Sequence, residues 1–206
     1  LTALAIQATI GQQKPVKLAK APTVLTRPAS NYDSNRLAAL QSLFEWPGHM
    51  VSKASIQTKN PLGEEDRKLF VLGRQHYLTT CAGCHGTDGA GLNRFAPPLI
   101  GSHWVLGDEK RLALIVLHGM EGPVDVVGKI YDVPEILPVM PSHSTMDDGV
   151  ITAILTYIRN EWGNAAGPMN RRTVGTTRHT SQGRVVPWTA PELNDHMKAT
   201  RAPDGK

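Results

Sequence analysis

Five consecutive residues constrain this chain more than any other feature: Cys81, Ala82, Gly83, Cys84 and His85. They form a Cys-x-x-Cys-His pattern, and the chain has no other cysteine. Two thiols one helical turn apart can add to the two vinyl groups on one edge of a porphyrin, and the adjacent histidine then lies under the ring and ligates iron. The pattern therefore predicts one covalent haem, attached through both cysteines, with His85 as an axial ligand.

Two other uses of paired cysteines fit the sequence less well. A structural zinc site needs four ligands, and only two cysteines are present. A redox-active dithiol does not require histidine at the next position, and no β-α-β pattern surrounds the motif. So few cysteines also exclude the small domains that are held together by disulfides.

The second axial ligand is expected among the methionines and histidines far along the chain. Met140 lies in Leu137-Pro138-Val139-Met140-Pro141, where the flanking prolines stiffen the backbone. A thioether held in this way suits a ligand that stays bound in both oxidation states, and Met/His ligation raises the reduction potential. Met140 is therefore the predicted ligand. Met146 or His143 in its place, or an open position, are the alternatives.

Hydrophobic spacing predicts mainly helices around the motif. Residues 64–81 and 146–163 have apolar positions at helical spacing, and Asp108 can cap a helix that runs through Leu117. Residues 83–101 are rich in Gly and Pro and are expected to be loop, and residues 122–135 indicate a short hairpin. We therefore predict an all-α fold with a small β hairpin.

Three further stretches resemble the class I monohaem cytochromes c. Gly73-x-x-x-Tyr77-x-x-x-Cys81 is similar to the first helix of that family, where the small glycine lets the last helix cross closely. Ala96-Pro97-Pro98-Leu99-x-Gly101 resembles the loop after the haem motif, and Ile154-x-x-Tyr157 resembles the face of the last helix that meets the first. The resemblance covers residues 64–163, about half of the chain.

The resemblance implies three to five helices around one haem c, and it implies roles for single residues. By this resemblance the Pro97 carbonyl accepts a hydrogen bond from the His85 ring, which fixes the tautomer and raises the basicity of the ligand. By the same resemblance Leu99 would pack on the porphyrin. Trp104 follows the proline loop, and from that position it is expected to close one side of the haem pocket. The predicted metal ligands are His85 and Met140, and the full predicted haem site is Tyr77, Cys81, Cys84, His85, Pro97, Leu99, Trp104 and Met140.

Charge and composition divide the chain into three parts. Residues 1–62 are expected to form an N-terminal extension with one short helix over residues 35–45, residues 63–163 a cytochrome c domain, and residues 164–206 an irregular C-terminal extension. The centre is acidic, with a net charge of −5 over residues 60–163, whereas both flanks are basic. The basic residues are scattered among Pro and Thr instead of being clustered with aromatics, which argues against nucleic-acid binding.

The composition limits the core and excludes a membrane span. The chain has only 3 Phe, 4 Trp and 4 Tyr, so a buried haem would supply apolar surface that further aromatic side chains supply in other cores. We therefore expect the chain without haem to be largely unfolded.

The longest uninterrupted apolar run, Leu112 to Leu117, is far shorter than the roughly 20 residues that cross a bilayer. The first residue is Leu, and we expect a processed product or a piece of a longer polypeptide.

A narrower likeness suggests a function. Residues 96–163 are similar to the cytochrome c domains of periplasmic quinoprotein alcohol and sugar dehydrogenases, and to the C-terminal domain of large bacterial membrane-bound dehydrogenases. The likeness implies single-electron transfer without catalysis. It implies a redox partner that is a dehydrogenase or a respiratory complex subunit, a location outside the cytoplasm, and membrane contact only through partners. A haem enzyme or gas sensor with a labile sixth ligand, and a structural subunit of a larger assembly, are the alternatives.

Overall fold

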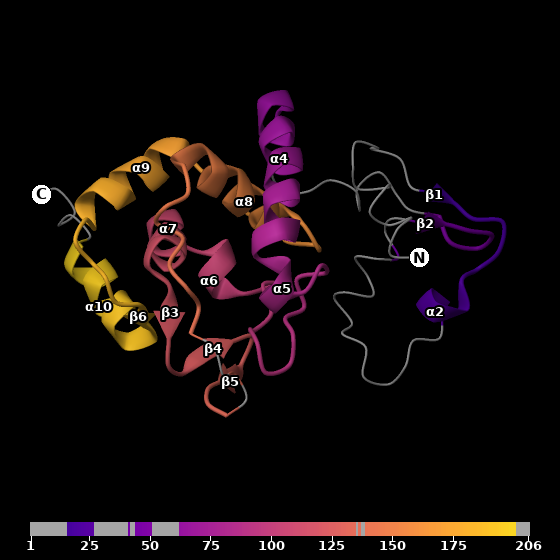
Figure 1. Cartoon of the computed structure of the whole chain (residues 1–206). Helices are drawn as coiled ribbons and strands as arrows, with labels where there is room; N and C mark the ends of the chain where they lie inside the picture. The colour runs from indigo at the N-terminus through magenta and orange to yellow at the C-terminus, as the bar shows by residue number, and fades with distance from the viewer. Residues whose placement is uncertain are drawn as a thin grey trace, which may run out of the picture. The chain divides into compact units, whose positions relative to one another are not determined.

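The computed structural model describes residues 16–26, 41, 44–50, 62–134, 136 and 139–200. The chain forms two compact units, residues 1–61 and residues 62–206, which are shown in Figure 1 and are described separately below.

The first unit contains a small parallel strand pair. Strand β1 (Val16–Lys17) pairs with β2 (Phe44–Glu45), and a single-turn helix, α2 (Thr23–Thr26), follows β1 in the sequence. Phe44 is buried, as are Leu25 and Trp46. The predicted helix over residues 35–45 is therefore wrong at its end, because Phe44 and Glu45 pair with β1. Gln41 is helical, and the rest of that segment lies outside the described residues.

The second unit is mostly helical, which confirms the predicted fold class. A parallel pair is formed by β3 (Met120–Glu121) and β6 (Trp188–Thr189), and the predicted hairpin is formed by β4 (Val124–Val126) and β5 (Lys129–Tyr131). The described part of this unit has seven helices: α4 (Glu64–Thr80), α5 (Ala82–His85), α6 (His103–Leu106), α7 (Glu109–His118), α8 (Asp148–Asn160), α9 (Arg171–Thr180) and α10 (Ala190–Thr200).

The predicted close crossing of the first and last helices of the cytochrome domain is present. A Cβ atom added to Gly73 of α4 would lie 1.9 Å from the backbone oxygen of Ala153 in α8. The rings of Tyr77 and Tyr157, also from these two helices, lie 5.3 Å apart between centroids. Only glycine at position 73 therefore lets α4 and α8 approach this closely (Figure 1).

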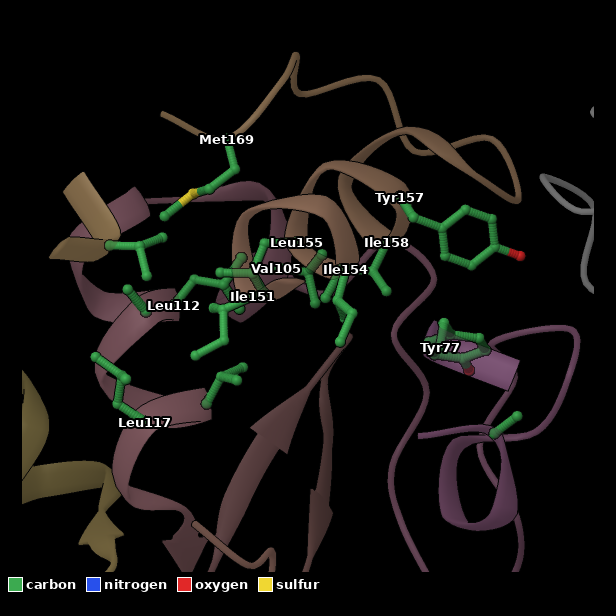
Figure 2. Packing of buried hydrophobic residues seen from close by; sticks show 14 residues of the cluster. Tyr77, Val105, Leu112, Leu117, Ile151, Ile154, Leu155, Tyr157, Ile158 and Met169 are labelled. Carbon is green, nitrogen blue, oxygen red and sulfur yellow. The ribbon is translucent and has the colours of Figure 1, made fainter. Parts of the chain in front are cut away.

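The main core lies between α4, α7 and α8. Figure 2 shows apolar side chains running from Leu112 of α7, past Ile151 and Ile154 of α8, to Tyr77 of α4. The apolar positions of α8 recur at helical spacing, and the helix is buried along nearly its whole length. This core supports the ends of the segments that carry the predicted haem ligands.

Residues 164–206 were expected to be irregular, and the structure corrects this expectation. Helices α9 and α10 lie in this segment, and α9 packs against α7 and α8. Val174 of α9 is fully buried in the main core, while Leu193 of α10 and Trp188 of β6 are buried in a second cluster. Residues 164–200 pack onto the cytochrome domain because these few apolar side chains find partners there. The described part of residues 63–163 contains the five helices α4 to α8, which agrees with the predicted three to five, and α9 and α10 lie beyond that domain.

One helix boundary differs from the expectations, whereas the predicted hairpin is present. Helix α8 begins at Asp148 and not at residue 146, because the side chain of Asp147 accepts a hydrogen bond from the Gly149 amide and caps the helix there. In the hairpin, both turn residues, Val127 and Gly128, have positive φ, which matches the twist of a two-residue turn.

A buried arginine joins three segments of the second unit. Arg159 of α8 is 4% exposed, and its guanidinium donates to the carbonyls of Val105 (3.0 Å), Gly107 (3.1 Å) and Ala166 (3.0 Å). One charged group thus satisfies carbonyls at the end of α6 and in the connection to α9.

In the described part of the chain, no helix is both long enough and apolar enough to cross a membrane.

Candidate haem site

The cysteine motif lies where α4 ends and α5 begins. Cys81 is the residue between these helices, and Cys84 and His85 lie in the single turn of α5. The two thiols form no disulfide, and both are half-buried. Burial raises the pKa of the Cys81 thiol to about 11, and the neighbouring Cys84 adds to that effect. The Cys81 thiol is therefore protonated near pH 7, and the motif presents two sulfurs and one imidazole from adjoining turns.

The His85 ring is held by the backbone contact that the resemblance implied. Its Nδ1 lies 3.1 Å from the Pro97 carbonyl oxygen, so the ring donates from Nδ1 and leaves Nε2 as the nitrogen that can bind a metal. Burial lowers the pKa of His85, the Pro97 carbonyl opposes that effect, and His143 lowers the pKa further. The ring is thus neutral near pH 7, which is the form that ligates metals.

The loop between His85 and α6 is braced from several sides. Tyr77 donates from its hydroxyl to the Gly86 carbonyl (2.5 Å), which ties α4 to the residue after the histidine. Asn164 is 3% exposed; it accepts from the Gly101 amide (2.9 Å) and donates to the Leu99 carbonyl (3.2 Å). These contacts hold the segment that contains Pro97, and so they hold the acceptor for the His85 ring.

Met140 lies in a second fixed segment, the ligand loop, which we define as residues 139–147. Met140 exchanges two backbone hydrogen bonds with Met120, of 3.0 and 3.2 Å. Gly119 has a φ of +84°, and an added Cβ there would lie 2.2 Å from the Met140 oxygen, so the close approach of these segments requires glycine. The Met140 side chain packs against both apolar clusters of this unit.

The remaining predicted site residues are placed in two groups. Leu99 is half-buried against the main core, as Met140 is. Trp104 is 6% exposed in the second cluster, which Met140 also contacts, and its indole donates to the Asp125 carbonyl (2.8 Å). The sequence alternatives are placed too: Met146 packs against the main core, and the amide of His143 donates to the Val116 carbonyl.

The residues present fit a haem c group. Two free thiols precede an imidazole whose outer nitrogen is available, and a thioether is fixed on a separate loop. Large apolar side chains near both segments are exposed, among them Phe95 (52%) and Val139 (48%), which leaves apolar surface for a large flat group to cover. Within the described residues no cluster of His, Cys, Asp and Glu side chains could hold a metal ion in another way.

Sequence reasoning missed three polar residues that organise this region: Asn164, Arg159 and Arg178. Each forms hydrogen bonds with backbone groups or a carboxylate that are distant in sequence. A single Asn or Arg in a polar stretch gives no periodic signal, so only the fold reveals its partners. Asn164 directly follows the predicted last helix, and asparagine side chains at such positions often bond backbone groups. This position was the only sequence signal for its role.

The arrangement defines a mostly helical protein that binds haem c covalently through Cys81 and Cys84, and comparison with known proteins agrees. Residues 70–162 match the family model for cytochrome c, so this part of the chain is a cytochrome c domain, which is consistent with the class I monohaem type. In this family the covalent haem carries single electrons.

Several curated proteins are similar to the chain. Cytochrome c-552 of Thermus thermophilus is 35% identical over 89 residues, which are 41% of this chain and 64% of that protein. The cytochrome c subunit of the quinone alcohol dehydrogenase of Gluconobacter oxydans is 27% identical over 128 residues, 57% of this chain and 26% of that subunit. The corresponding subunit of Komagataeibacter europaeus is 32% identical over 98 residues, 47% of this chain and 20% of the subunit. The chain thus spans less than two thirds of the length of each of these relatives.

A half-buried carboxyl gives the stability of this domain a pH dependence. Burial raises the pKa of Glu161, at the end of α8, from 4.5 to about 7, although Arg74 opposes the shift. A carboxyl whose pKa is raised by folding stabilises the folded state below its unfolded pKa and loses that contribution as pH rises. We therefore expect the unfolding free energy to fall between pH 4.5 and 7, and Glu161→Gln to remove that part of the slope. Urea unfolding of both proteins at several pH values measures it; parallel profiles would contradict the assignment.

Proposed function

We propose that this chain is a one-electron carrier in which His85 and Met140 are the axial ligands of the haem. When bound, the haem supplies an iron that alternates between the ferric and ferrous states. The observation that carries the proposal is the His85 ring, which the Pro97 carbonyl orients beside the two cysteines.

The chain's own residues fix the positions of both proposed ligands without the haem. The imidazole is fixed through Pro97, and that loop is fixed in turn by Asn164. The thioether is fixed through the backbone pair between Met140 and Met120. Ligands that are already in place need little rearrangement when the charge on a metal changes, which suits repeated electron transfer.

A redox titration of the full haem-bound chain tests the carrier function. We expect one reversible one-electron transition, and a ferrous form that binds carbon monoxide poorly because Met140 occupies the sixth position. Immediate and tight binding of carbon monoxide by the wild-type protein would contradict the proposal and would favour a haem enzyme or gas sensor.

We also propose that the redox partner is a dehydrogenase or a respiratory complex subunit and that the protein works outside the cytoplasm, with membrane contact only through its partners. Two similar proteins are named as cytochrome c subunits of a quinone alcohol dehydrogenase, which supports this choice. Native mass spectrometry of the assembly purified from its source would show the haem adduct and the companion chains together. A dehydrogenase or respiratory subunit is the expected companion, and companions without a redox cofactor would contradict the proposal.

A further inference from the structure

The ligand loop is fastened by a part of the chain that lies beyond the cytochrome c match at residues 70–162. The cytochrome domain itself holds the middle of the loop, through the Ser142 hydroxyl that donates to the Leu117 carbonyl (2.6 Å). Residues 164–200 contact the loop directly near its end and support its start through Met120, the backbone partner of Met140. We call this segment the C-terminal clamp.

The first contact of the clamp is made by Arg178 of α9. Its guanidinium donates to the carbonyl oxygens of Ser144 and Met146 in the ligand loop, the latter at 2.5 Å. It also donates to the carboxylate of Asp148, the first residue of α8, at 2.7 Å. One cation thus joins the end of the ligand loop to the start of α8 by charge-assisted hydrogen bonds, which are the stronger kind.

Helix α9 can act as a fixed support for Arg178 because its inner face is buried. Val174 is fully buried in the main core, and Thr177 is 2% exposed. The helix packs against α7 and α8, and in the chain the ligand loop comes after β5 and directly before α8. The backbone of Arg178 is therefore fixed by the packing of α9 on the core, independently of the ligand loop.

The second contact is made by Trp188 of β6. Its amide donates to the Gly119 carbonyl (3.1 Å), and β6 pairs in parallel with β3, with Trp188 opposite Met120. Met120 is the residue that exchanges backbone hydrogen bonds with Met140. The Trp188 ring is 4% exposed, in the cluster against which both methionines pack.

We propose that the C-terminal clamp positions Met140 as an axial ligand, with Arg178 and Trp188 as its positioning residues. The inference rests on the proposed ligation by Met140. The loop must open for Met140 to leave the iron, and opening would break the contacts of Arg178 with Ser144 and Met146. The clamp therefore makes detachment of the methionine less favourable without touching the iron.

Binding of imidazole to the ferric protein measures this directly, because an added ligand must displace Met140. Its apparent affinity is the intrinsic affinity multiplied by the fraction of molecules with an open loop. We expect Arg178→Ala to raise the apparent affinity roughly tenfold, because it removes charge-assisted hydrogen bonds that hold the loop closed. Arg172→Ala is the matched control: Arg172 is exposed on the same helix, and its loss is expected to change the affinity by no more than about twofold.

The outcomes separate the clamp from the ligand assignment. Absence of sulfur at the iron of the wild-type protein would overturn the ligation by Met140, and the clamp with it. Sulfur ligation in the wild type, with equal imidazole affinities for Arg178→Ala and Arg172→Ala, would overturn the clamp alone. If Arg178→Ala does not fold, Arg178→Lys takes its place, because one ammonium cannot keep the paired geometry of a guanidinium. An intermediate rise in imidazole affinity is then expected, and wild-type affinity would overturn the clamp.

Discussion

Replacing both Cys81 and Cys84 by alanine is expected to leave the chain largely unfolded. A covalent haem buries several hundred Å² of apolar surface, which contributes on the order of 10 kcal/mol at about 25 cal/mol per Å² before ordering costs are subtracted. That is comparable with the whole stability of an ordinary domain. The large apolar side chains left exposed in the second unit, such as Phe95 and Val139, agree with a core that is completed by a cofactor.

Far-ultraviolet circular dichroism of the double variant measures this effect. We expect loss of most of the helical signal, together with loss of covalently bound haem. The control is the pair Thr79→Ala and Thr80→Ala, which changes two exposed residues at the end of the same helix and should leave both signals unchanged. Native helix content in the cysteine variant would show that the protein core is sufficient without haem.

The second large effect is expected at the crossing of α4 and α8. In Gly73→Ala, the new methyl group would lie 1.9 Å from the Ala153 oxygen and 2.9 Å from the Tyr157 Cβ. The nearest obstacle is backbone, which cannot rotate away, so the two helices must separate. Such overpacking costs about 3 kcal/mol or more when the backbone has to move.

Gly83→Ala is the matched control for this substitution. Gly83 also lies in a helix, but an added Cβ there meets no atom within 4 Å. Chemical denaturation of the haem-bound proteins should show a lower midpoint for Gly73→Ala only. Equal midpoints for the two variants would mean that α4 and α8 do not cross as closely as the structure places them.

The features that could be predicted from the sequence are those set by short motifs or by periodicity. The cysteine pair and His85 follow one another directly, and the apolar stripe of α8 repeats at helical spacing. The hydrogen bond between His85 and the Pro97 carbonyl could be expected through the resemblance to the family. These expectations needed no knowledge of distant partners.

The C-terminal clamp could not be predicted in this way. Helix α9 is mostly polar, and only Val174 and Thr177 are buried, so it has no apolar stripe to recognise. Arg178 gains its role from carbonyls more than thirty residues away, and Trp188 from a strand of two residues. Such interactions depend on the tertiary arrangement, and the sequence shows only a polar tail.

X-ray absorption at the iron edge of the haem-bound chain tests the central claim most directly, because it detects a sulfur bonded to iron. We predict a sulfur neighbour in the wild-type protein and in Met146→Ala, where the changed methionine packs against the core. We predict its loss in Met140→Ala. A wild-type spectrum without iron-bound sulfur, or a sulfur signal that persists in Met140→Ala, would contradict ligation by Met140.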